Sequence, residues 1–312
     1  VGTLQFFAAR RDSASLARVV DYALARHYPT RLLETAEMPH GNERRGRRAL
    51  ALLQAVATKQ AQLIAHWMRI GFIHGVMNTD NVTLSGETID YGPCAFMDTY
   101  DPTTVFSSID RNGRYAYGRQ PIIGQWNLAR LGEALLPLLA DDEAEAIRLV
   151  EAVMKGFVES YEAAFISGMV EKLGVTGVQP SDTTLVADLL TWMQTTRQDF
   201  TSTFRLLSSG LRSQTRPFCD GEFAAWHGRW LIRIGEDEHT EVARRMDAVN
   251  PAYIPRNHLV EEALEAAVGG DLAPFNRLLA VLGEPYEERA EDARYAEPAP
   301  SEFGAYQTFC GT

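Results

Sequence analysis

Cysteine is scarce in this sequence, and a long apolar run is missing altogether. The 312 residues hold three cysteines, Cys94, Cys219 and Cys310, which are too few and too scattered for a disulfide framework or a zinc site. No apolar stretch approaches the length of a membrane-spanning helix, and the start lacks a signal-peptide pattern. These absences predict a reducing, cytoplasmic compartment and no membrane partner.

The sequence also lacks an excess of basic over acidic residues. The net charge is −11, from 30 Lys and Arg against 41 Asp and Glu, so nucleic acid is not expected as a partner. Arginines do cluster at positions 44, 45, 47 and 48, where a solvated helix face is a more common explanation than a binding patch. The hydrophobic share of 46% is that of a globular protein, whose length allows one large domain or two. Its oligomeric state stays open.

The hydrophobic pattern predicts a mainly helical (α+β) protein. A strand is expected at Val1–Ala8, and the tail from Glu284, rich in Glu, Pro and Ala, is expected to be loosely ordered. Apolar residues at helical spacing, with capping residues at the starts, predict helices over residues 12–27, 43–70, 122–139, 141–173, 181–208, 223–233, 239–248, 257–267 and 273–282.

Acidic and amide side chains gather in the stretch GFIHGVMNTDNVTLSGETIDYGP, residues 71–93. Asn81 supplies an amide oxygen and Asp90 a carboxylate, and a short β-hairpin over residues 82–89 would place both at one end of the ribbon. Magnesium prefers such oxygen ligands together with nucleotide phosphates. Asp80, next to Asn81, would then be a carboxylate able to accept a proton or to hold a second ion.

Each tripeptide, TDN or DYG, is by itself typical of an ordinary turn. Their order after a long helix and a His-Gly loop favours a functional interpretation, because kinases place a metal-binding Asn seven residues after the loop His. Counting from His74, the seventh residue is Asn81, but the second, where kinases carry the catalytic Asp, is Val76. The stretch is therefore kinase-like without the usual base, and His74 itself is expected to pack.

Several motifs extend this pattern over nearly the whole chain. HGVMNTDN, TIDYGP and FMDTYDP are followed by GRYAYGRQPIIGQWNLARLGEALLPLL (113–139), DFTSTFRLL (199–207) and NPAYIPRNHLVEEAL (250–264). Together they resemble the selenoprotein O family of protein adenylyltransferases, also called the YdiU or UPF0061 family.

This resemblance implies a pseudokinase that binds ATP in a flipped orientation with Mg²⁺ or Mn²⁺. It implies transfer of AMP to Ser, Thr or Tyr hydroxyls of proteins, with release of pyrophosphate. Asp80 would be the proton acceptor, and Asn81 and Asp90 the metal ligands, with Asp90 also contacting the bound nucleotide through the metal. Residues 1–140 would form a kinase-like C-lobe, and residues 141–312 a family-specific helical extension.

The start of the chain departs from the family pattern. The resemblance places the Gly-rich loop, the ATP-binding Lys and two phosphate-binding arginines before Val1, so the chain is expected to be the C-terminal lobe portion. Without those groups, electrostatic stabilisation of the transferred group would be incomplete, and this chain alone is expected to have little or no transferase activity. Robust incorporation of label from ATP by this chain alone would contradict that expectation.

Two other functions stay open. One is ordinary phosphotransfer with Asp80 as base, which would release ADP in place of pyrophosphate. The other is a non-catalytic scaffold, against which nucleotide-dependent thermal stabilisation that is lost in Asp90→Ala would argue. Asp98 and Asp101 are expected to make turns more than to bind substrate. The resemblance also implies redox control through the tail: Cys310 with Cys94 is one conceivable pair, and an unpaired thiol is an equal alternative.

Overall fold

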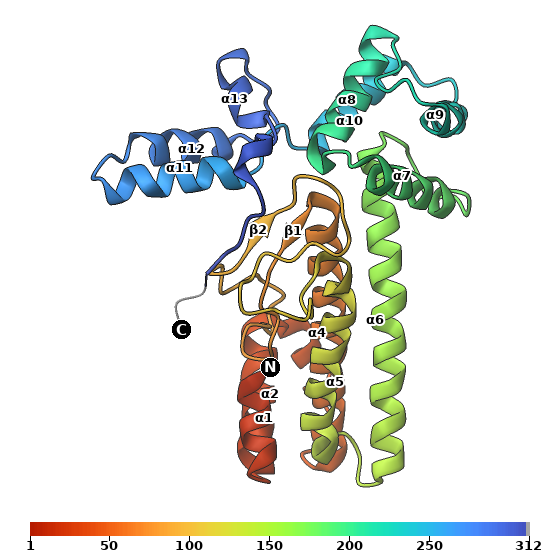
Figure 1. Cartoon of the computed structure of the whole chain (residues 1–312). Coiled ribbons are helices and arrows are strands. Elements are labelled where there is room, and N and C mark those ends of the chain that lie inside the picture. Colours follow the sequence, from red (N-terminus) through yellow and green to blue (C-terminus); the bar gives the residue numbers. More distant parts are fainter. Residues whose placement is uncertain (310–312) are drawn as a thin grey trace. The chain divides into compact units, whose positions relative to one another are not determined.

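The protein is described by a computed structural model in which residues 1–309 are placed (Figure 1). It is mainly helical, as predicted. Within residues 1–309 the regular sheet is an antiparallel pair, β1 (Phe72–Ile73) and β2 (Ala95–Phe96), with Phe72 opposite Phe96. None of the helices in this range combines the length and the apolar character that a membrane crossing requires.

The helices follow one another along the chain with few long gaps. Their bounds are α1 (Gly2–Ala9), α2 (Ser13–His27), α3 (Pro29–Leu33), α4 (Asn42–Ile70), α5 (Gln120–Leu139), α6 (Glu143–Lys172), α7 (Asp182–Thr196), α8 (Phe200–Ser213), α9 (Gly221–Ile234), α10 (His239–Val249), α11 (Asn257–Val268), α12 (Ala273–Gly283) and α13 (Ala293–Ala296), with 3₁₀ turns at Tyr117–Arg119, Ala290–Asp292 and Ser301–Phe303.

By internal contacts the chain forms two compact units that interleave along the sequence. The first comprises Val1–His66, Val76–Gly92 and Gly118–Ala164, and the second comprises Trp67–Gly75, Pro93–Tyr117 and the described chain from Phe165 onward. The expected functional division into residues 1–140 and 141–312 stays a prediction.

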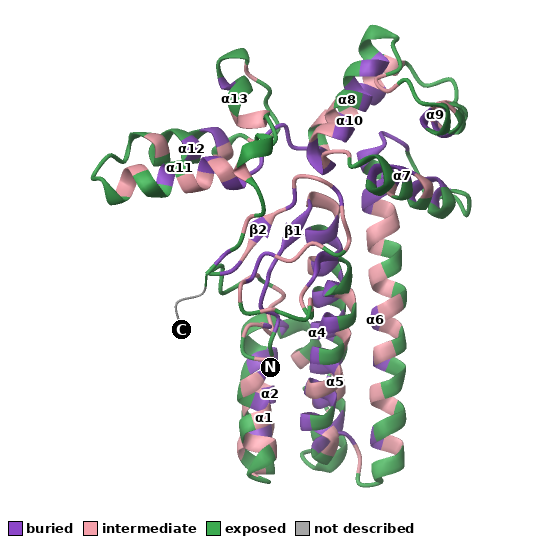
Figure 2. Ribbon diagram, in the orientation of Figure 1, coloured by how far each residue is buried: buried purple, intermediate pink, exposed green. Residues whose placement is uncertain are grey.

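The core of the first unit lies along α4 and α5. Figure 2 shows buried residues running along both helices, and those of α4 include Leu53, Val56 and Ile64. Gly124 and Gly132 of α5 let neighbours come close: a Cβ on the first would overlap Ile64 of α4, and one on the second would meet Val150 of α6. The long amphipathic helices are therefore packed as the periodicity predicts.

The predicted strand at Val1–Ala8 is wrong, because Gly2–Ala9 is α1. This segment packs against α5 and α2, and Leu4 is fully buried. A short apolar run fits a buried strand or a buried helix turn equally well from its periodicity alone. Helical neighbours offer no strand edge to pair with, so the helix, which satisfies its own backbone, is formed.

The single helix predicted over residues 181–208 is also wrong. Arg197 takes a left-handed conformation with φ of 56°, and Asp199 begins a new helix by accepting a hydrogen bond from Ser202 N at 2.7 Å. Phe200 N in turn donates to Asp98 O at 2.7 Å, and Thr99 forms an antiparallel bridge with Asp199. Backbone pairing with a distant loop therefore interrupts a sequence that is locally helical.

The described part of the tail is anchored, which corrects the expectation of a loosely ordered segment from Glu284. Asp292 is buried and pairs with Arg277 and Arg289. Further on, Thr308 N donates to Phe106 O at 2.8 Å, and its hydroxyl donates to Pro93 O at 2.8 Å. The Glu, Pro and Ala content of this segment reflects its solvent-exposed side chains. Its backbone is held by a few buried polar contacts, which the composition does not reveal. Cys310 lies outside the described residues.

Arg256, at the start of α11, is fully buried at the centre of a polar cluster in the second unit. Its Nη1 donates to Asp98 Oδ1 at 2.6 Å and to Asp199 Oδ2 at 2.7 Å. Its Nη2 donates to Asp199 Oδ1, to Ser202 Oγ and to Ala296 O at 2.9 to 3.1 Å. Burial works against the charge, but the two carboxylates outweigh it and raise the pKa of Arg256, so the group stays ionised.

Lys172, the last residue of α6, is buried without a carboxylate partner among the described residues. Its Nζ lies 4.0 Å from the ring centroid of Phe204 and 5.4 Å from that of Phe200. The ring faces favour the ammonium form, but desolvation disfavours it more strongly and the nearby Arg69 adds to this, so the pKa of Lys172 falls to about 7.

This buried lysine is expected to make stability depend on pH. Between pH 7 and about 10.5 the unfolded chain binds a proton at Lys172 that the folded chain lacks, so stability rises with pH across that window. The free energy of unfolding is expected to rise by about 2 kcal/mol from this group between pH 7 and pH 9. Lys172→Met should remove that slope in urea titrations, whereas Lys155→Met, exposed on the same helix, should retain it. An unchanged slope in Lys172→Met would contradict the assignment.

Candidate functional site

The loop that carries the predicted site residues lies in the first unit and is held by Asn78. The Asn78 side-chain oxygen accepts hydrogen bonds from Asp80 N at 3.1 Å and from Asn81 N at 3.0 Å, and its carbonyl accepts from Asn81 N at 3.1 Å. An asparagine that binds the backbone two and three residues ahead fixes a tight turn. The turn leaves the Asp80 side chain exposed, and within residues 1–309 no hydrogen bond reaches its carboxylate.

Asn81 and Asp90 are brought together as the sequence predicts. Asn81 Nδ2 donates to Asp90 Oδ2 at 2.5 Å and to the carbonyl of the buried Val76 at 3.1 Å. Both hydrogens of the amide are thereby used, which leaves Asn81 Oδ1 and the second carboxylate oxygen of Asp90 as acceptors. In the described chain neither of these two oxygens receives a hydrogen bond.

The predicted hairpin between these residues is present only as a single antiparallel bridge, between Val82 and Thr88. Its tip is closed by Thr83, whose hydroxyl donates to Glu87 O at 2.7 Å and accepts from Glu87 N at 3.0 Å. Gln60 of α4 holds the same segment by donating to Thr83 O at 2.8 Å. A short segment tied to a long helix replaces the expected two-stranded ribbon and sets the spacing of Asn81 and Asp90.

Asp90 has a left-handed backbone with φ of 57°. That region costs roughly 1–2 kcal/mol for an L-residue, although Asp and Asn tolerate it better than most. The strain coincides with the hydrogen bond to Asn81, so the surrounding structure holds the carboxylate in a conformation it would otherwise leave. Strained backbone of this kind is concentrated at functional sites.

The first turn of α1 lies directly against the Asp80 loop. Gly2 N donates to Thr79 O at 3.1 Å, and a Cβ added to Gly2 would overlap Asp80 Oδ1. Glycine at this position therefore permits the close approach that places the start of a helix beside the carboxylate.

Gly2→Ala is expected to displace Asp80 and to lower the free energy of unfolding by about 1–3 kcal/mol, as overpacking does elsewhere. The matched control is Gly221→Ala, at the first residue of α9, where nothing lies within 4 Å of the new methyl group. That variant should be neutral or slightly more stable. Thermal unfolding of both variants tests this, and equal stabilities would show that Asp80 does not limit the space at Gly2.

Three residues that hold the loop were missed in the sequence. Asn78 could have been found, because an Asn two and three residues before Asp80 and Asn81 is a turn signal. Gly2 and Asn127 carry no such signal. Asn127 of α5 is buried and donates to Met77 O at 2.9 Å across fifty residues of sequence, so only the packed structure reveals it.

His74 lies in the second unit, where it is buried and contacts aromatic rings. Its ring centroid is 5.3 Å from that of Trp67 and 6.4 Å from that of Phe72. This environment agrees with the packing role expected for it. Asp101 makes a turn by accepting from Thr103 N at 2.8 Å, and Asp98 is committed to Arg256. Asp101 therefore makes a turn, as expected, whereas Asp98 forms a long-range ion pair that the sequence did not predict.

The donor set of the loop fits a magnesium ion. Mg²⁺ is usually held by one or two carboxylates, with phosphates and water completing its six oxygens. Asp90 and the Asn81 amide oxygen provide such a partial set, with Asp80 adjacent in sequence. Within residues 1–309 no group of three or more His, Cys, Asp or Glu side chains forms a complete metal cage. The loop therefore offers only part of the oxygen set that such an ion takes.

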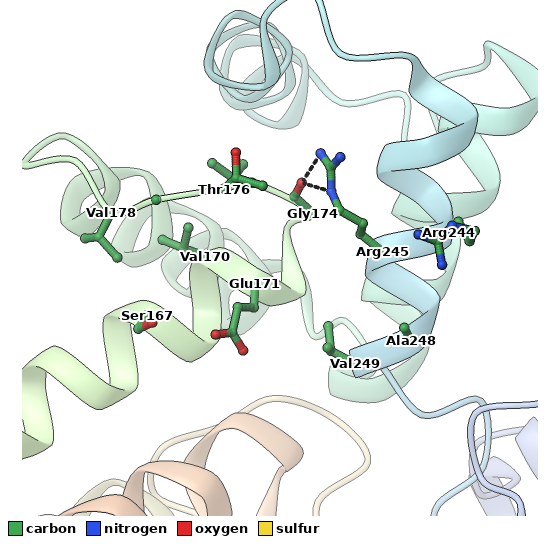
Figure 3. Close-up of a pocket in the computed structure, with 12 residues that line it drawn as sticks. Ser167, Val170, Glu171, Gly174, Thr176, Val178, Arg244, Arg245, Ala248 and Val249 are labelled. Carbon is green, nitrogen blue, oxygen red and sulfur yellow. Dashed lines mark hydrogen bonds between the residues drawn. The ribbon is translucent and has the colours of Figure 1, made fainter.

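A cavity of about 430 Å³ in the second unit contains none of these residues (Figure 3). Figure 3 shows Arg245 reaching across to the carbonyl of Gly174, to which it donates at 2.9 Å. Arg245 also pairs with Asp237, and Arg244 pairs with Glu241. The cations at this cavity are therefore already neutralised, and its other walls are largely apolar. It offers no carboxylate and amide pair like that of the loop.

Comparison with known sequences gives the family of this chain. The profile of the family described as "Protein adenylyltransferase SelO" matches residues 1–283. Curated relatives named "Protein nucleotidyltransferase YdiU" include those of Cereibacter sphaeroides (54% identical over 317 residues), Halalkalibacterium halodurans (52% over 316) and Rhizobium johnstonii (50% over 325). Each match covers 100% of this chain and 62–63% of the relative, so the chain spans less than two thirds of their length. The chain belongs to the SelO family of protein adenylyltransferases.

Proposed function

We propose that this chain supplies the metal-binding side of an active site that transfers AMP from ATP to Ser, Thr or Tyr hydroxyls of proteins. The observation that carries the proposal is the Asn81–Asp90 pair, whose mutual hydrogen bond leaves one oxygen on each side chain able to bind a cation. The family membership supports a nucleotide substrate. A kinase-like lobe, with Val76 at the position of the usual base, is part of the same proposal.

Each residue has a separate role in the proposed reaction. Asn81 and Asp90 would hold Mg²⁺ or Mn²⁺, which when bound neutralises phosphate charge. The substrate hydroxyl attacks the α-phosphorus of ATP, the bond from that phosphorus to the β-phosphate oxygen breaks, and pyrophosphate leaves. Asp80, whose carboxylate accepts no hydrogen bond from the described chain, takes the hydroxyl proton.

The position of the label in ATP tests this proposal against phosphotransfer. The full-length protein is incubated with an acceptor protein and either α-labelled or γ-labelled ATP. Adenylylation incorporates the α label and releases pyrophosphate, whereas a kinase incorporates the γ label and releases ADP. Transfer of the γ label would overturn the proposal. Absence of transfer of either label, with nucleotide still bound, would favour a scaffold.

A further inference from the structure

Four arginines converge on a second cavity, in the first unit, that the proposed reaction does not use. It has a volume of about 790 Å³ and lies between the start of α2 and the start of α4. Its lining is mainly polar and basic and comprises Ser13, Ala14, Ala17, Arg18, Asp21, His40, Gly41, Arg44, Arg45 and Arg48. Arg47, although part of the same arginine run, is exposed and does not line it.

Most of this positive charge is not neutralised within the described chain. Arg48 is paired, since its Nη1 contacts Asp21 at 2.9 Å, and Asp21 is the single acidic residue among those that line the cavity. Arg18 donates only to the Ser15 hydroxyl, and Arg45 makes no side-chain hydrogen bond with any described residue. Within residues 1–309 neither they nor Arg44 form an ion pair.

Arg44 makes only long side-chain hydrogen bonds within the described chain. Its Nη1 reaches the His40 ring at 3.3 Å and Met38 O at 3.4 Å, but its Nε is buried and has no hydrogen-bond partner in the described chain. A buried guanidinium N–H that lacks an acceptor is costly, and native proteins rarely leave one unsatisfied. Because this Nε is closed to solvent, a ligand in the cavity would have to bind the Nη atoms of Arg44.

Two helix starts add positive potential to the same cavity. Ser13 and Ala14 are the first residues of α2, and Gly41 precedes the first turn of α4. The positive ends of helices bind anions through their backbone N–H groups. Two carboxylates outside the lining lie in the same region. Asp12 caps α2 by accepting from Ser15 N at 2.9 Å and also attracts the Arg18 cation, and Glu43 lines a neighbouring pocket that Arg45 and Ser13 share.

The composition of the walls narrows the class of ligand. Among the lining residues, alanine and glycine are the apolar members and His40 carries the one ring, which Arg44 already contacts, so the cavity offers little surface for a nucleobase or an acyl chain. All four side chains with a fixed positive charge are arginines, whose forked donors match phosphate oxygens in pairs. We propose that this cavity binds a compact polyphosphate, of which inorganic pyrophosphate is the smallest representative.

Titration calorimetry with pyrophosphate tests the site, with EDTA present so that a metal–nucleotide site is silent. Saturable binding of pyrophosphate is expected. Arg45→Ala should raise the dissociation constant at least about tenfold, because one charge-assisted hydrogen bond to the ligand is lost. Arg45 is chosen because its side chain makes no hydrogen bond or ion pair with any described residue. Arg47→Ala makes the same change of charge on the same helix outside the cavity and should alter affinity less than about twofold.

Two further arms decide between this site and its alternatives. Asp90→Asn should bind pyrophosphate as well as the unaltered protein, which separates this inference from the proposed reaction. A tetraglutamate peptide should bind more weakly than pyrophosphate. The inference is overturned if no saturable binding occurs, if Arg47→Ala and Arg45→Ala weaken it equally, if Asp90→Asn abolishes it, or if the acidic peptide binds as tightly.

Discussion

Asp80→Asn is expected to lower AMP transfer by the full-length protein by about 10²–10⁴-fold, the range that a positioned general base contributes. The amide has the shape of the carboxylate but cannot accept the hydroxyl proton. Cation binding should change little, because the Asp80 carboxylate has no bond to Asn81 or Asp90. Turnover with labelled ATP and Mn²⁺ binding by electron paramagnetic resonance measure the two effects separately.

The variant Asp90→Asn should separate the proposed role of metal ligand from that of proton acceptor. Asp90→Asn keeps a residue that tolerates the left-handed backbone but removes the charge that a cation requires, so Mn²⁺ affinity and activity should fall together. Glu87→Gln is the matched control, because this exposed carboxylate in the same segment bonds only to Ser85. Full activity in Asp80→Asn would remove Asp80 from the proposed mechanism, and unchanged Mn²⁺ affinity in Asp90→Asn would remove the metal site.

Arg256→Met is expected to lower the free energy of unfolding by about 3–5 kcal/mol. The methionine fills part of the space but leaves Asp98 and Asp199 buried or half-buried without their counter-charge. It also removes the bond to Ala296 O, so the described tail loses one of its anchors. Urea unfolding measures the stability, and hydrogen exchange of residues 293–309 measures the tail.

A surface pair provides the comparison for this buried cluster. Arg294→Met breaks an ion pair with Glu262 in which both side chains are about half exposed, and it should cost no more than about 1 kcal/mol. Restoring electroneutrality in the triple variant Arg256→Met, Asp98→Asn, Asp199→Asn should recover part of the lost stability, because the uncompensated charges are then gone. Equal losses in Arg256→Met and Arg294→Met would show that burial adds nothing to the cluster.

The site loop was largely predictable because its information is local. Asn81 follows the loop residue His74 by seven positions, and Asp90 follows Asn81 by nine. The side chains of Asn81 and Asp90 are hydrogen-bonded to each other in the structure. The hairpin expected between them is reduced to one bridge, since a contact with Gln60 of α4 holds the segment in place of a second strand. The spacing in the sequence indicated that Asn81 and Asp90 come together. The packing against α4 decided which contacts hold the segment between them.

The wrong predictions share a physical cause. α1 was expected as a strand, and one helix was expected where Arg197 and Asp199 separate α7 from α8. In both places, contacts with residues distant in sequence decide between conformations of similar intrinsic preference. For α1 these contacts are with the flanking helices, and for the break between α7 and α8 they are with the backbone of Asp98–Tyr100. Local propensity is small compared with such tertiary contacts.

The sequence alone determined the features that depend on neighbours a few residues apart: the helical class, the region where α2 begins, and the pairing of Asn81 with Asp90. The tertiary structure decided which distant side chains share a space. It placed Gly2 against Asp80, and Arg18 of α2 in one cavity with three arginines of α4. The reason is that helical hydrogen bonds and caps join residues only a few positions apart in the sequence, whereas the approach of two helices depends on the whole packed core.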